Sequence, residues 1–171
     1  MQTDDNLFTF ALPEGTERKL ERKGNYHLGD LVNKFVPGGL GSQPASAPEA
    51  QGQRPLFQTE HIFFTSSGRI GLIHDVSDEV SLDLTALQRN MAGVIVGPGE
   101  TKHNQWRTPA NSRGRSDAED SATGFLDGDF LEKFLTYPEP DKLLKGQIAA
   151  ERLSLSVGRV EDILEKLQSF T

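Results

Sequence analysis

The stretch HIFFTSSGRIGLIHD (residues 61–75) decides the fold of the first part of the chain. Two apolar runs, Ile62-Phe63-Phe64 and Ile70-Gly71-Leu72-Ile73, flank the triplet Ser66-Ser67-Gly68. Aromatic and β-branched residues favour strands, and a glycine that can take positive φ suits the turn between two strands. The stretch therefore predicts an antiparallel β-hairpin.

The residues before this hairpin also favour strands. NLFTF (6–10) and NYHLGDLVNKF (25–35) carry aromatic and β-branched residues, and each predicts a strand. PGGLGSQPASAPEAQGQRP (37–55) follows, and eight of its nineteen residues are Pro or Gly. We expect a disordered loop there, because the segment lacks the apolar residues that would order it. Residues 1–76 are thus predicted as a β region of roughly six strands at most, too few to close as a repeat fold.

After residue 76 the apolar residues recur at helical spacing. They form four sets, each on one predicted helical face with charged residues between. A polar stretch, TPANSRGRSDAEDSA (108–122), is predicted to be a loop between the first two sets. Residues 77–171 are therefore predicted as a small bundle of about four helices. The sets are Leu84, Leu87, Met91, Val94 and Ile95; Phe130, Leu131, Phe134 and Leu135; Leu143, Leu144 and Ile148; and Val160, Ile163, Leu164 and Leu167.

The composition excludes several classes of protein. The 171 residues carry a net charge of −7, which argues against the broad basic face that non-specific nucleic-acid binding needs. No apolar run approaches the roughly 20 residues that cross a membrane, and the first ten residues lack the features of a signal peptide. Without cysteine there is no disulfide, no thiolate nucleophile and no cysteine-based zinc site. We expect a soluble intracellular protein with no membrane partner.

The stretch ATGFLDGDFLEKF (122–134) places two aspartates, Asp127 and Asp129, directly before an apolar run. With Asp129 as the N-cap, Glu132 falls at the N3 position and completes a capping box. The alternative is a small hydrolase or a metal site that uses the two carboxylates. A calcium loop needs further oxygen ligands at alternating positions, and these are absent. The pair is predicted to start a helix.

Other motifs fail as catalytic or cofactor sites. The segment GVIVGPGETKH (93–103) lacks the Gly-Lys-Ser/Thr of a phosphate-binding loop, since Thr101 precedes Lys102 and His103 follows it. No serine lies in a Gly-x-Ser-x-Gly elbow. The four histidines have no metal-ligand spacing and are interpreted as structural or surface residues. We predict no catalytic residue, no metal site and no cofactor. The histidines are His27, His61, His74 and His103.

Trp106, the single tryptophan, lies next to Arg107. We expect its ring to pack between the helices and the β region. The alternative is that Trp106 and Arg107 anchor a partner, since these residue types dominate binding hot spots.

Four segments together resemble one known family. They are YHLGDLVNKF (26–35), FFTSSGRIGL (63–72), HNQWR (103–107) and ATGFLDGDFLEKFL (122–135). In order and spacing they are similar to the C-terminal region of the damaged-DNA-binding large subunits. These belong to the superfamily of the cleavage-and-polyadenylation factor large subunit and a spliceosomal relative. The resemblance covers nearly the whole chain.

The resemblance implies a β + α fold. The family has three seven-bladed β-propellers and a C-terminal helical domain, so residues 1–76 would form the terminal blades of the third propeller. Residues 77–171 would form the helical domain. The first two propellers and most of the third have no counterpart in this sequence, which agrees with the small number of predicted strands.

The resemblance also implies a non-enzymatic adaptor that is located in the nucleus and also in the cytoplasm. In the family the middle propeller holds a cullin, and the first and third propellers hold the substrate receptors of a cullin-RING ubiquitin ligase. Damaged DNA is recognised largely through such a receptor. Because the middle propeller has no counterpart here, cullin binding is not carried over. The alternative is a nucleic-acid-binding subunit of an RNA-processing complex, as in the polyadenylation and splicing branches.

Three positions correspond to the family's receptor-facing residues: Leu31, Asn33 and Ser66. Leu31 stands where the family commonly has an aromatic residue. Because residues two apart on a strand point to one face, Leu31 and Asn33 are predicted to give a shallow apolar anchor with one oriented hydrogen bond. The alternative is that they are ordinary strand positions.

Overall fold

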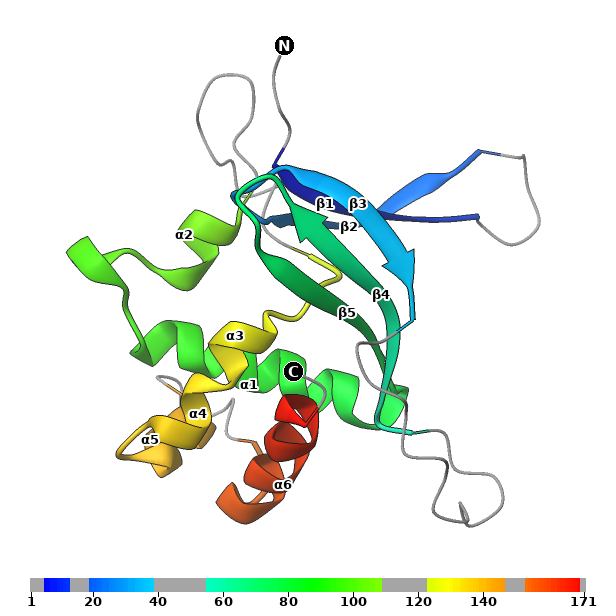
Figure 1. Ribbon diagram of the computed structural model, residues 1–171. Coiled ribbons are helices and arrows are strands. Elements are labelled where there is room, and N and C mark those ends of the chain that lie inside the picture. Colours follow the sequence, from blue (N-terminus) through cyan, green and yellow to red (C-terminus); the bar gives the residue numbers. More distant parts are fainter. Residues whose placement is uncertain (1–4, 13–18, 39–54, 109–122, 147–152, 170–171) are drawn as a thin grey trace. The chain divides into compact units, whose positions relative to one another are not determined.

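The computed structural model describes residues 5–12, 19–38, 55–108, 123–146 and 153–169, as two small antiparallel sheets and a set of helices (Figure 1). This agrees with the predicted β + α class. The loops predicted at 37–55 and 108–122 lie almost wholly outside the described residues. In the described part of the chain, no helix combines the length and the apolar character that crossing a bilayer requires.

Strands give way to helices where the sequence predicted. Strand β5 ends at Val76 and helix α1 begins at Asp78. The compact units do not follow this boundary, however. One unit consists of residues 1–31 and 95–126, and the other of residues 32–94 and 127–171. The change at residues 76 and 77 is therefore a change of element type, and the division into two domains at this point stays a prediction.

The first unit is built on a two-stranded hairpin. Strand β1 (Asn6–Ala11) pairs antiparallel with β2 (Glu21–His27). The chain returns to this hairpin at Thr123, whose backbone exchanges two hydrogen bonds with Asn25 of β2, at 2.9 and 3.1 Å. The unit also contains the 3-10 helix η1 (Pro98–Glu100) and the short helix α2 (His103–Arg107).

The second unit contains the predicted hairpin. Strand β4 (Phe57–Thr65) pairs with β5 (Ile70–Val76) on one side and with β3 (Val32–Pro37) on the other. All pairs are antiparallel. Gly68 has φ of 87° in the turn between β4 and β5, a conformation that residues with a Cβ rarely adopt. The hairpin prediction is confirmed.

The strand predicted over 25–35 is wrong as a single element. The chain forms two strands there, β2 ending at His27 and β3 beginning at Val32, and they belong to different sheets. Gly29 between them has φ of 75°, which breaks the extended backbone that one strand would need. The glycine in His27-Leu28-Gly29 was the sign of this break.

The helices of the second unit share one apolar core. Helix α1 (Asp78–Val94) packs against α3 (Gly128–Leu131) and α5 (Pro140–Lys145), while α4 (Lys133–Thr136), α5 and α6 (Val157–Gln168) pack against one another. The predicted helical faces are confirmed for most of their described members, but Ile95 follows the end of α1, and Val94 and Leu135 are only half-buried. Ile148 lies outside the described residues. The buried members of these faces are Leu84, Leu87, Met91, Phe130, Leu131, Phe134, Leu143, Leu144, Val160, Ile163, Leu164 and Leu167, and Val80 and Leu153 are buried as well.

Candidate partner-binding surface

Asn33 lies at a β-bulge near the start of β3. Val32 pairs with Thr65 and Lys34 pairs with Phe64, so Asn33 is an extra residue on β3 relative to β4. The Asn33 side chain is exposed. A bulge interrupts the alternation of a strand and redirects side chains locally. The structure therefore gives Asn33 a backbone setting that an ordinary strand position would not have.

Ser66 lies at the same end of this sheet. It follows Thr65, the residue of β4 that pairs with Val32, and begins the turn to β5. Because β3 and β4 are antiparallel, the start of β3 and the end of β4 are neighbours. Asn33 and Ser66, which are far apart in the sequence, are thus brought together. The exposed side chains of Lys34 and Arg69 add positive charge at this end.

Leu31 does not fit the predicted geometry. It precedes β3, belongs to the first compact unit, and is 40% exposed. Its amide donates a hydrogen bond to Asp30 Oδ1 at 2.9 Å. Since Leu31 is outside the strand and a bulge follows at Asn33, the expectation that both side chains alternate onto one face of a strand is wrong. The role of Leu31, Asn33 and Ser66 in partner binding stays a prediction.

The prediction that Trp106 packs inside the protein is also wrong, because its side chain is 46% exposed. Arg107 of α2 is buried, as is His103, and the Arg107 guanidinium lies 3.7 Å from the centre of the Trp106 ring and 4.6 Å from that of Tyr26. Arg107 Nη1 also donates to the carbonyl oxygen of His27 at 3.2 Å. The cation between two rings attaches α2 to β2 and leaves Trp106 at the surface.

The acidic pair starts a helix, but the capping residue was predicted incorrectly. Asp127, not Asp129, is the N-cap, and its Oδ1 accepts a hydrogen bond from Phe130 N at 3.3 Å. The Asp127 amide donates to Gln88 Oε1 of α1 at 2.7 Å, which fixes the start of α3 two residues earlier than predicted. Asp129 is then exposed in the first turn, where the helix dipole favours a negative charge.

Replacing Asp127 by alanine is therefore expected to lower the free energy of unfolding by about 1 kcal/mol, through loss of the cap. Asp129→Ala, two residues away, is the matched control and should lower the free energy of unfolding by only about 0.3 kcal/mol. Chemical denaturation of the two variants measures both values. Equal losses, or a larger loss for Asp129→Ala, would show that the cap assignment is wrong.

Two of the histidines lie within hydrogen-bonding distance of polar side chains on neighbouring strands. His27 Nδ1 lies 2.9 Å from Asn6 Oδ1, and His74 Nδ1 lies 3.1 Å from Thr59 Oγ1. Burial lowers the pKa of His74, which favours its neutral form. Within the ranges that the structure describes, no group of three His, Asp or Glu side chains could hold a metal ion.

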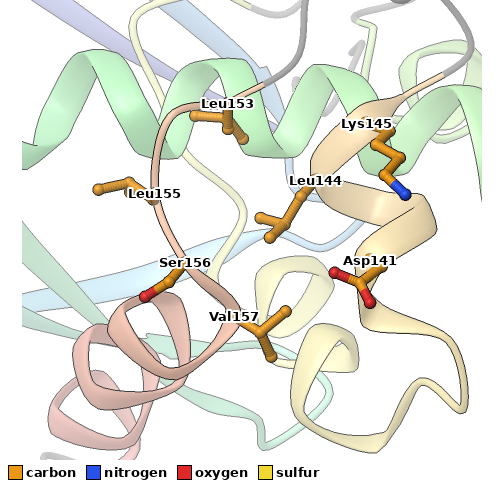
Figure 2. A pocket seen from close by; sticks show the side chains of 7 residues that line it. All are labelled: Asp141, Leu144, Lys145, Leu153, Leu155, Ser156 and Val157. Carbon is orange, nitrogen blue, oxygen red and sulfur yellow. The ribbon is translucent and has the colours of Figure 1, made fainter.

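A small cavity of about 180 Å³ lies between α5 and the start of α6 (Figure 2). Leu144 and Lys145 of α5 line one side, and Ser156 and Val157 line the other. Its volume is below the roughly 300–1,000 Å³ of small-molecule sites. The cavity is formed by other residues than Asn33 and Ser66, so it adds nothing to the candidate surface.

Comparison with known proteins finds a matching family model and several similar proteins. The family model described as the CPSF A subunit region matches residues 2–136. DNA damage-binding protein 1 of Solanum lycopersicum is 34% identical over 172 residues, which cover 97% of this chain and 14% of the relative. DNA damage-binding protein 1b of Arabidopsis thaliana is 32% identical over 154 residues, which cover 90% of this chain and 12% of the relative. DNA damage-binding protein 1 of Oryza sativa subsp. japonica is 34% identical over 167 residues, which cover 92% of this chain and 14% of the relative. The chain thus spans only a small part of the length of these relatives.

Proposed function

The chain belongs to the family of the CPSF A subunit region, and from this premise we propose that it is part of an adaptor related to DNA damage-binding protein 1. The resemblance seen in the sequence is confirmed by the family match and by the relatives that are 32–34% identical over most of the chain. Their name describes them as proteins that bind DNA damage. The proposed role is to dock the substrate receptors of a cullin-RING ubiquitin ligase.

One observation carries the proposal: Asn33 and Ser66 lie at one end of the β3–β4–β5 sheet. An exposed amide and a hydroxyl held on a bulge and a tight turn can fix the orientation of a partner by hydrogen bonds. Leu31, which directly precedes β3 in the chain, would supply an apolar contact. The exposed Lys34 and Arg69 favour a partner with acidic groups beside the docking site.

The fold suits this role. We assign the two antiparallel sheets to terminal blades of a β-propeller, in which each blade normally has four strands. The sheets of two and three described strands would then be parts of such blades. The adaptor would act without catalysis, in the nucleus and also in the cytoplasm. Damaged DNA would be reached through the receptor, and the cullin through other parts of a longer relative.

Receptor binding can be measured directly. The 171-residue chain is immobilised, and a substrate receptor that recognises ultraviolet-damaged DNA is passed over it. We expect saturable receptor binding and no cullin binding on the same surface. A folded chain, verified by circular dichroism and thermal unfolding, that shows no saturable receptor binding would overturn the proposal.

A role in RNA processing is the second candidate, because the description of the matching family names the CPSF A subunit. The names of the relatives favour the damage-binding branch. The same immobilised chain distinguishes the two when single-stranded RNA is the second analyte. Tight RNA binding without receptor binding would favour the RNA-processing role.

A further inference from the structure

Thr65 lies at the point where the two strands of the candidate surface meet. It is the last residue of β4, pairs with Val32 of β3, and is only 5% exposed. The bulge at Asn33 follows this pair on β3, and Ser66 follows Thr65 in the chain. Thr65 is therefore linked to both predicted contact residues, to Ser66 by the chain and to the bulge at Asn33 by its pairing with Val32.

The side chain of Thr65 organises the turn that contains Ser66. Its Oγ1 accepts a hydrogen bond from Arg69 N at 3.1 Å and donates to Arg69 O at 3.4 Å. The same oxygen lies 3.2 Å from Ser67 Oγ. Together these contacts can engage the one donor and both acceptor positions of a hydroxyl group.

The backbone of Thr65 closes the same turn. Its amide donates to Arg69 O at 3.0 Å, and its carbonyl oxygen accepts from Gly68 N at 3.1 Å. The backbone hydrogen bonds define the path of the turn. The hydrogen bonds of the Thr65 hydroxyl join the two ends of the turn in addition. The side chain therefore reduces the freedom of the residues between Thr65 and Arg69 before any partner binds.

We propose that Thr65 is a positioning residue of the receptor-docking surface, which it serves by holding the turn that presents Ser66 in register with Asn33. This inference rests on the proposed receptor-docking function. A surface that is ordered before binding loses less conformational freedom when the partner arrives, so its affinity is higher. Without the hydroxyl only the backbone hydrogen bonds would hold the turn, and the remaining order would have to be supplied when the receptor binds.

The test uses the full 171-residue chain and the same substrate receptor that recognises ultraviolet-damaged DNA. Thr65→Val removes the hydroxyl, keeps the shape, and introduces a residue that strands favour. We expect receptor affinity to fall about tenfold. Thr65→Ser, which keeps the hydroxyl, should stay within about threefold of the unchanged chain. Thr59→Val removes another β4 hydroxyl, at the opposite end of the strand beside His74, and should leave affinity unchanged.

A double-mutant cycle separates positioning from general destabilisation. If Thr65 acts through Ser66, Thr65→Val should change affinity less than about twofold in a chain that already carries Ser66→Ala. If Thr65→Val does not fold, the exposed Ser67→Ala removes one partner of the hydroxyl and should weaken binding about threefold.

The outcomes are distinct. Unchanged affinity in Thr65→Val, or an undiminished effect in the Ser66→Ala chain, overturns the inference, as does a loss of affinity in Thr65→Ser equal to that in Thr65→Val. When Thr65→Val fails to fold, unchanged affinity in Ser67→Ala overturns it. If the combined Leu31→Arg and Asn33→Asp change weakens binding while Thr65→Val does not, the positioning role alone is wrong. If the unchanged chain does not bind the receptor, the proposed function fails first.

Discussion

Replacing Leu31 by arginine together with Asn33 by aspartate is expected to lower the affinity of the chain for the receptor about thirtyfold. The first change places a charge where the proposed contact is apolar, and the second replaces an amide that can donate by a carboxylate that only accepts. An unpaired charge in a desolvated contact costs on the order of 2 kcal/mol or more, which corresponds to a thirtyfold change in the dissociation constant. Surface plasmon resonance with the immobilised chain measures the change.

The chain offers a matched control for this double change. Leu82 is 79% exposed on α1, and Asn104 is exposed on α2. Leu82→Arg with Asn104→Asp makes the same chemical replacements at residues that are not part of the candidate surface and should leave receptor affinity within about twofold, since such surface changes have small effects. If both double variants lose affinity equally, the effect is not local, and Leu31 and Asn33 must be removed from the surface. Wild-type affinity in the first variant would have the same consequence.

Phe134→Ala is expected to lower the free energy of unfolding by about 3–5 kcal/mol. Phe134 is 1% exposed on α4, a helix that packs against both α5 and α6. Truncating the ring removes apolar contacts and leaves a cavity that the neighbouring helices fill only in part. Because domains of this size have a total stability of about 5–15 kcal/mol, the variant is expected to be partly unfolded at 37 °C.

Denaturant unfolding followed by far-ultraviolet circular dichroism measures the loss. Leu82→Ala also removes a large apolar side chain from a helix, but the residue is exposed, so its effect should be below about 0.5 kcal/mol. A small loss for Phe134→Ala would show that α4 does not form part of the core of the second unit.

The helices and the hairpin could be predicted because their signals are local. The spacing of Leu84, Leu87 and Met91 follows from burying one face of α1, and Gly68 marks a turn that few other residues could make. The break after His27 was less visible, because Gly29 lies within a run of strand-forming residues. The capping residue was misplaced because it depends on Gln88, a contact from another helix that spacing alone does not reveal.

The candidate surface could be predicted only in part. The resemblance to the family's receptor-facing positions indicates Leu31, Asn33 and Ser66. Their geometry, however, depends on strand pairing over long sequence separations. The bulge at Asn33 arises from the register between β3 and β4, and no residue type in VNKFVP indicates a bulge. Trp106 was misjudged for a similar reason, since the neighbouring Arg107 is the side chain that Tyr26 and His27 bury.

The interleaving of the two units has a consequence for synthesis of the protein on the ribosome. The hairpin of β1 and β2 belongs to a unit that also needs residues 95–126. After Leu31 leaves the peptidyl transferase centre, residues 32–126 must still be added, which takes roughly 5–20 s at about 5–20 residues per second. During this interval Tyr26, which is buried against Phe125 and Arg107 in the folded unit, lacks these neighbours and is available to chaperones and to other nascent chains. The yield of native protein in cells is therefore expected to depend on translation speed between β3 and Thr123.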